Sequence, residues 1–187
     1  MILIIDCGSS KTPEIEKNLT AVKQHSITLK YTDTFDSSNQ YKGIIISGAP
    51  TLVTELDPQP YIDKFLFLLS IEIPVLGICF GHQILGMVFG ATAAKCKEAR
   101  KPIEIIIQNE LRIFNELNSS SSFSEDHCEM ISLPKDFIQT ASSLFCEIEG
   151  MQHKSKPLFG VQFHPETSDK NGIQLFKNFM KICDNKK

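Results

Sequence analysis

The chain has 187 residues, of which 42% are hydrophobic and 22% charged, and its formal net charge is −3 at pH 7. This length and balance are typical of one globular domain with a sizeable buried core. A small negative charge gives no general attraction to nucleic acid or to anionic membranes, so we expect neither as a partner. No apolar stretch approaches the roughly 20 residues of a membrane helix, and the N-terminal run lacks the basic leader of a signal peptide.

The cysteines and histidines narrow the chemistry further. The six cysteines are scattered and include no C-x-x-C pair. Disulfides are rare in reducing cytosol, and scattered cysteines mostly behave as small buried hydrophobic residues. We therefore predict a cytoplasmic protein with five structural cysteines and one that carries chemistry. The five histidines show no metal-ligand spacing, so we expect no metal site.

Buried strands alternate with helices in the first half of the chain. Continuous aliphatic runs predict three strands, at residues 2–5, 43–47 and 74–78. Helical periodicity lies at Ile15, Leu19 and Val22, at Tyr61, Phe65, Leu68 and Leu69, and from Cys79 to Phe89. Thr12 is expected to cap the first helix, with Pro13 at its first position.

The second half is richer in strands. Runs at 103–107, 144–148 and 158–163 predict strands without long helices between them, Ser119–Ser122 is typical of a polar loop, and a last helix begins near Gly172. This order predicts an α/β fold with a mostly parallel central sheet, helices on both faces and a smaller strand-rich section. We expect one domain over residues 1–187.

The segment Gly77-Ile78-Cys79-Phe80-Gly81-His82-Gln83 places one thiol between a strand and a helix. Flanking glycines let the backbone pass through a sharp turn, as in the nucleophile elbow of hydrolases. The helix N-terminus favours a thiolate and directs free N–H groups at an oxyanion. The alternative is a buried structural cysteine between two packing glycines. His82 is interpreted as a packing residue rather than a catalyst.

A second segment, Gln162-Phe163-His164-Pro165-Glu166, supplies an imidazole and a carboxylate. Pro165 restricts His164 to extended geometry, so that both side chains can project to one side. The carboxylate can then orient the imidazole while its other nitrogen activates a thiol. Alone, such a segment is more often a surface turn; together with the cysteine elbow it indicates nucleophilic catalysis.

A third segment, Ser47-Gly48-Ala49-Pro50, ends a strand and could supply a further backbone N–H. The three segments in this order resemble the class I glutamine amidotransferases, whose blocks read roughly S-G-G-P, G-x-C-x-G-x-Q and Q-F-H-P-E. The resemblance runs from Ile2 to about Phe179. Ala49 departs from it, because the family usually has glycine there and alanine resists positive φ.

The resemblance implies a role for each matching residue. Cys79 is the nucleophile, His164 the general base and acid, and Glu166 orients the imidazole. The backbone N–H groups of Ala49 and Phe80 form the oxyanion hole, and Gly48 and Gln83 bind the substrate, L-glutamine. Glutamine is hydrolysed through a thioester to glutamate and ammonia, with no metal and no organic cofactor in this half-reaction.

Ammonia is useful only at a second active site, so a partner synthetase is expected. The best match is the separate glutaminase subunit of GMP synthetase. Ile5-Asp6-Cys7-Gly8-Ser9 resembles its opening I-D-x-G-S/G, and Asp126-His127-Cys128-Glu129 resembles its S-H-x-D block. Ser168-Asp169-Lys170 departs from the H-T that follows H-P-E. The partner would be a synthetase subunit of the ATP-pyrophosphatase type, and ATP and Mg²⁺ are expected only there.

Two other functions remain open from the sequence. One is a stand-alone thiol hydrolase of γ-glutamyl compounds, which needs no partner. The other is a catalytically weak regulatory module on the same fold, against which the complete set of Cys79, His164 and Glu166 argues.

Overall fold

The computed structural model describes residues 1–34, 41–108 and 112–185. Its strands are β1 (Ile2–Asp6), β2 (Ser26–Lys30), β3 (Gly43–Ile46), β4 (Val75–Ile78), β5 (Ala93–Ala99), β6 (Ile103–Ile107), β7 (Ser120–Phe123), β8 (His127–Ile131), β9 (Phe137–Ser142), β10 (Gly150–His153) and β11 (Leu158–Val161). Its helices are α1 (Thr12–Ala21), α2 (Gln59–Lys64), α3 (Phe80–Val88) and α4 (Asp169–Asp184), with 3₁₀ turns η1 (Leu66–Leu69), η2 (Arg112–Phe114) and η3 (Pro165–Thr167). None of these helices is long and apolar enough to cross a membrane.

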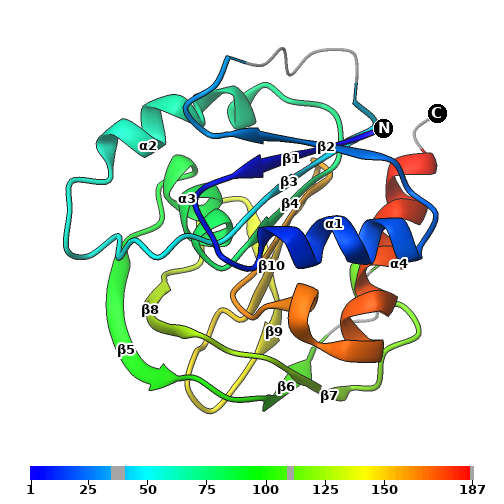
Figure 1. Ribbon diagram of the computed structural model, residues 1–187. Coiled ribbons are helices and arrows are strands. Elements are labelled where there is room, and N and C mark those ends of the chain that lie inside the picture. The colour runs from blue at the N-terminus through cyan, green and yellow to red at the C-terminus, as the bar shows by residue number, and fades with distance from the viewer. Residues whose placement is uncertain (35–40, 109–111, 186–187) are drawn as a thin grey trace.

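One sheet of nine strands runs through the molecule in the order β2-β1-β3-β4-β11-β10-β9-β6-β7 (Figure 1). The pairs from β2 to β11 are parallel, and the pairs from β11 to β7 are antiparallel. Strands β5 and β8 form a separate antiparallel pair. The predicted α/β architecture with a strand-rich second half is confirmed, and the parallel pairing lies in its first half.

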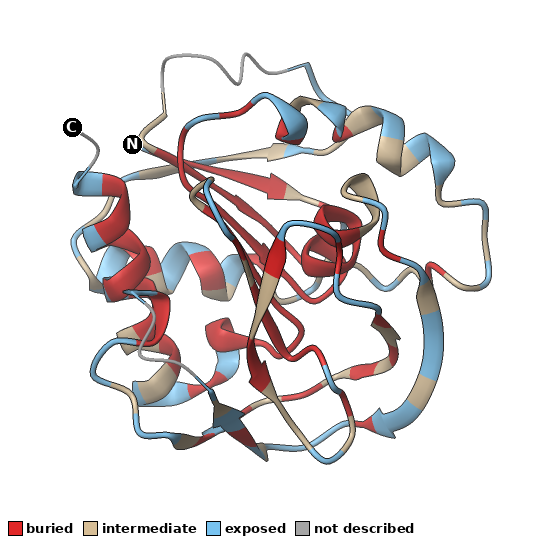
Figure 2. Cartoon of the chain, turned by 180° about the vertical axis from the view of Figure 1, so that it is seen from behind, coloured by how far each residue is buried: buried red, intermediate tan, exposed pale blue. Residues whose placement is uncertain are grey.

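Helices cover both faces of the parallel strands, which explains their continuous aliphatic sequences. Ile2 and Ile4 of β1 point to the face covered by α1 and α4, whereas Leu3 and Ile5 point to the face covered by α2 and α3. All four side chains are fully buried. In Figure 2 the centre of the sheet is buried almost throughout, while the outlying strand β5 is largely exposed. A strand buried on both faces needs apolar residues at every position.

Three expectations about strands were wrong or incomplete. Residues 144–148 form the connection between β9 and β10, where the Ser143 hydroxyl accepts hydrogen bonds from the N–H groups of Phe145 and Cys146. The serine run expected as a loop is β7, which pairs with β6 through its backbone. Strand β2 was not predicted, because its half-exposed sequence has no strong apolar pattern.

Three helices differ from their predicted starts or ends. Lys11, not Thr12, is the N-cap of α1, and the Thr12 hydroxyl donates instead to Asp6 Oδ1 at 2.8 Å. The helix expected through Leu69 ends at Lys64 and continues as η1, which leaves Leu69 46% exposed. The last helix, α4, begins three residues before Gly172, at Asp169.

Candidate active site

Cys79 lies at a sharp turn between the end of β4 and the start of α3. Its φ of 51° and ψ of −107° lie in a region that residues other than glycine rarely adopt. A Cβ on Gly77 would lie 2.5 Å from the Gly81 carbonyl oxygen, and one on Gly81 would collide with the Ile46 carbonyl. Both glycines are therefore required for the close backbone packing that holds the thiol in this strained position.

His164 and Glu166 form a buried pair directly after β11. The Nδ1 of His164 lies 2.7 Å from Glu166 Oε1, and the two residues are each 3% exposed. The backbone holds the histidine from both sides, since its N–H donates to the Ser124 carbonyl at 2.8 Å and its carbonyl accepts from the Ser168 hydroxyl at 2.6 Å. At His164, the residue before Pro165, φ is −103° and ψ is 87°, so ψ falls short of the extended region that was expected.

The electrostatics of His164 fit proton transfer. Burial alone would lower its pKa, but hydrogen bonds and negative charge from Cys79 and Glu166 outweigh burial and raise the pKa to about 10. At neutral pH the imidazole therefore holds a proton beside the sulfur and can give it to a leaving group.

Two glutamine side chains link the thiol to the surrounding strands. Gln162 Nε2 lies 3.5 Å from the Cys79 sulfur, and its Oε1 accepts from Gln83 Nε2 at 3.1 Å. Gln83 also approaches the Glu129 carbonyl at 3.5 Å. Sequence reasoning selected Gln83 but missed Gln162, although it lies two residues before His164 in the same segment. In this structure the Gln83 amide supports Gln162.

The loop after β3 lies directly over the thiol and the imidazole. A Cβ on Gly48 would lie 3.3 Å from His164 Cε1 and 3.7 Å from Cys79 Cβ, so glycine allows the closest approach here. The Ser47 hydroxyl donates to the Gly48 carbonyl at 2.8 Å and thereby fixes the turn. Ala49 is not among the described residues with positive φ, so alanine is compatible with the loop as it stands.

The pocket at the thiol is narrow. It is lined by Ala49, Thr51, Leu52, Cys79, Phe80, Gln83, Asp126, His127, Cys128 and Glu129. Its volume is about 30 Å³. The Glu129 carboxylate accepts from the N–H groups of Val53 and Thr54 at 2.9 and 2.8 Å and so ties the loop across the opening.

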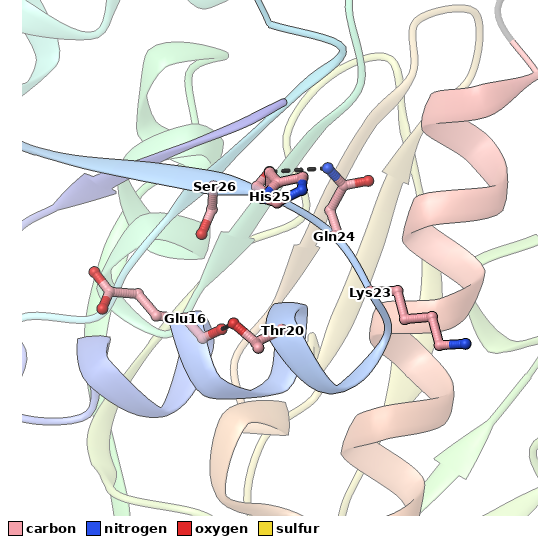
Figure 3. A pocket seen from close by; sticks show the side chains of 6 residues that line it. All are labelled: Glu16, Thr20, Lys23, Gln24, His25 and Ser26. Carbon is pink, nitrogen blue, oxygen red and sulfur yellow. Dashed lines mark hydrogen bonds between the residues drawn. The ribbon is translucent and has the colours of Figure 1, made fainter.

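A larger hollow elsewhere has no comparable chemistry. About 560 Å³ in volume, it is lined by Glu16, Thr20, Lys23, Gln24, His25 and Ser26, at the turn between α1 and β2 (Figure 3). The Gln24 amide donates to the His25 carbonyl there at 2.8 Å. This turn precedes β2, at the amino ends of the parallel strands, whereas Cys79 follows the carboxyl end of β4.

Comparisons with known proteins agree with this site. Residues 3–183 match the model of the family "Glutamine amidotransferase class-I". The chain is 34% identical to a subunit of the glutamine-hydrolysing GMP synthase of Methanothermobacter thermautotrophicus and 35% identical to its counterpart in Methanopyrus kandleri, in each case over 98% of both chains. A Thermoplasma acidophilum protein assigned as a GMP synthase subunit superposes with a TM-score of 0.88 and 28% identity, covering 98% of this chain and 93% of that one. A Thermotoga maritima glutamine amidotransferase, 20% identical, shares the fold with a TM-score of 0.76, covering 97% of this chain and 84% of that one.

Proposed function

Because this chain belongs to the class I glutamine amidotransferase family, we propose that it hydrolyses L-glutamine with Cys79, His164 and Glu166 as its catalytic groups. The observation that carries the proposal is the meeting of a strained thiol with a buried imidazole–carboxylate pair whose hydrogen bond is 2.7 Å long. Each group has one role in the reaction.

In the first step the Cys79 sulfur attacks the side-chain amide carbon of glutamine, while His164 already holds the proton of the thiol. The negative charge moves to the amide oxygen, where the N–H groups of Phe80 and Ala49 would stabilise it. Phe80 suits this task because it begins α3 and its N–H has no partner within the helix. The C–N bond then breaks as His164 protonates the departing ammonia.

In the second step water attacks the γ-glutamyl thioester. His164 takes a proton from this water, the same N–H groups stabilise the second oxyanion, and the C–S bond breaks. Glutamate leaves and the thiol is restored. Glu166 holds the imidazole in one orientation and stabilises its charged form throughout. This sequence of steps balances without an organic cofactor or metal.

The names of the relatives support a destination for the ammonia. Several are subunits of a glutamine-hydrolysing GMP synthase, and they match nearly the whole of this chain. We infer that a separate synthetase subunit, of the ATP-pyrophosphatase type and carrying ATP and Mg²⁺, receives the ammonia and forms GMP. This coupling favours the amidotransferase over a stand-alone γ-glutamyl hydrolase.

Labelling with a glutamine-analogue electrophile tests the assignment of the nucleophile. We expect one label per chain, on Cys79, with a parallel loss of ammonia release from glutamine. Cys96→Ala is the matched control, because that half-exposed thiol on β5 does not line the pocket. A label mainly on Cys96 or Cys128 would contradict the proposal. Copurification with a synthetase subunit tests the partner separately.

A further inference from the structure

Three ionisable side chains meet in the interior beside the segment that holds His164. Glu125 precedes β8, His127 begins it, and Glu149 precedes β10. One ligand atom from each lies within 4.8 Å of those of the other two, and His127 Nε2 is 3.2 Å from Glu125 Oε2. The three residues are 4%, 5% and 0% exposed. Water therefore has little access to these groups.

Within the described part of the chain, most of the polar atoms in this cluster have no hydrogen-bond partner. These atoms are both carboxylate oxygens of Glu125, Glu149 Oε2 and His127 Nε2. The side chains of Lys11 and Arg100 both pair with Asp126 instead of with these atoms. Buried polar groups are almost always satisfied, and isolated buried carboxylates are costly. The cluster is thus arranged to receive something positively charged.

The surrounding hydrogen bonds define which atoms are available. His127 Nδ1 lies 2.9 Å from the Glu129 carbonyl, which can only accept, so Nδ1 carries the proton and Nε2 presents a lone pair to the cluster. The Ser143 hydroxyl donates to Glu149 Oε1 at 2.6 Å and leaves Oε2 free. Metal-bound histidines and carboxylates are oriented by outer hydrogen bonds of this kind.

We propose that Glu125, His127 and Glu149 bind one divalent cation, and that Zn²⁺ is the metal that fits best. One imidazole nitrogen with carboxylate oxygens suits Zn²⁺, and three protein ligands leave a fourth position for water. Tetrahedral zinc with ligand distances of about 2.0–2.2 Å places any two ligand atoms about 3.3–3.6 Å apart, so the three side chains must move closer together when the ion binds. Two carboxylates balance the charge of the ion. Mg²⁺ is disfavoured, because it prefers oxygen ligands and keeps several waters.

Such a site had no signal in the sequence, where the absence of paired histidines led us to expect no metal. Only one ligand is a histidine, and Glu149 lies far along the chain from Glu125. The structural consequence is local. Glu125 follows Ser124, whose carbonyl accepts the His164 N–H at 2.8 Å, so the cation would brace the segment that supports the imidazole.

The test uses the full chain carrying Cys79→Ala, stripped with a chelator, so that zinc cannot bind the nucleophilic thiol. Calorimetric titration with Zn²⁺ should give one site per chain, and the melting temperature should rise with zinc. Glu149→Gln should weaken binding by at least about 100-fold, and Ser143→Ala by about 10-fold. Glu98→Gln, an exposed carboxylate on β5, is the matched control and should bind as the parent does.

Co²⁺ substitution distinguishes this site from the nearby thiol, since Cys96 Sγ lies 3.6 Å from His127 Nδ1. The carboxylate–imidazole site predicts Co²⁺ spectra without thiolate charge-transfer bands. Thiolate bands that disappear in Cys96→Ser would overturn the proposal, because they would place the metal on the Cys96 thiol. The absence of stoichiometric zinc binding, or zinc binding that Glu149→Gln leaves unchanged, would also overturn it. If Glu149→Gln fails to fold, the zinc affinity of Ser143→Ala tests the proposal instead. An affinity equal to that of the parent would contradict the site.

Discussion

Among the described residues, two buried histidines each lie within 3.2 Å of the carboxylate of a buried glutamate two positions away in the sequence, and they have opposite environments. In one, His164 uses Nδ1 to contact Glu166 at 2.7 Å and its ring interacts with the Cys79 thiol. In the other, His127 uses Nδ1 to contact a backbone carbonyl and Nε2 to approach Glu125 at 3.2 Å. The same two residue types thus face different partners through different ring nitrogens.

The two pKa values follow these contacts. The pKa of His164 is raised to about 10, because the interactions with Cys79 and Glu166 outweigh burial. Burial lowers the pKa of His127, and the nearby negative charge of Glu149 does not fully compensate. One imidazole therefore stores a proton for transfer, and the other stays neutral with a lone pair available. The histidine and glutamate have the same spacing in the sequence in both pairs. The roles of the two imidazoles therefore differ because their rings contact different groups.

The largest effect should come from removing the imidazole of the first pair. His164→Ala should lower kcat for glutamine hydrolysis by about 10⁴-fold, nearly as much as Cys79→Ala, because residues that act as a unit are not additive. Ammonia release by the two single variants and the double variant is the measurement. A double variant far slower than either single one would show that the two groups act independently.

A smaller loss is expected from the carboxylate. Glu166→Gln keeps a hydrogen-bonding group near Nδ1 but removes the charge, and we expect kcat to fall by about 10²-fold. Steady-state rates across pH compare this variant with the parent. A loss equal to that of His164→Ala would mean that the carboxylate does more than orient and stabilise the ring.

A smaller change again is expected at the loop over the thiol. Ala49→Gly frees the backbone that would supply an oxyanion N–H, so basal kcat should change by up to about 10-fold while KM changes less. Ammonia release is measured with and without the synthetase subunit. We also expect the isolated parent chain to be slow and to be activated by the partner, since losing one such donor costs about 10²- to 10³-fold. Full activity of the isolated parent, unchanged by Ala49→Gly, would mean that the oxyanion hole is already formed.

A third histidine, outside both pairs, is expected to affect the stability of the fold rather than catalysis. His82 is fully buried, and burial lowers its pKa to about 3. Below about pH 6.5 the His82 imidazole is protonated in the unfolded chain but stays neutral in the folded chain. The free energy of unfolding therefore falls as the pH drops from about 6.5 toward 3. Relative to His82→Gln, the parent should lose about 1.4 kcal/mol more per pH unit in this window. Urea unfolding at several pH values gives these slopes, and parallel slopes would contradict the buried neutral state.

Local sequence patterns predicted the parts of the site in which neighbouring residues act together. The glycines around Cys79 and the His164-Pro165-Glu166 turn carry their geometry within a few residues. Gln162 was missed as a contact of the sulfur, and the cluster of Glu125, His127 and Glu149 depends on strands brought together by the fold. The run at 144–148 is mostly apolar, which suits a strand, but the prediction was wrong because these residues form a turn in which Leu144 is 93% exposed.

The position of β11 has a consequence for the order of folding. This strand lies between β4 and β10, so it joins the parallel and antiparallel halves of the sheet although it is the last strand in the chain. During synthesis β1, β3 and β4 can pair early, with the Cys79 turn at their edge, but His164 follows β11. Pairing between distant segments is slow, and chains fold largely from the N-terminus as they emerge. A nascent chain would therefore carry its thiol without a proton acceptor until the sheet closes, and hydrolysis would begin only with the final long-range pairing.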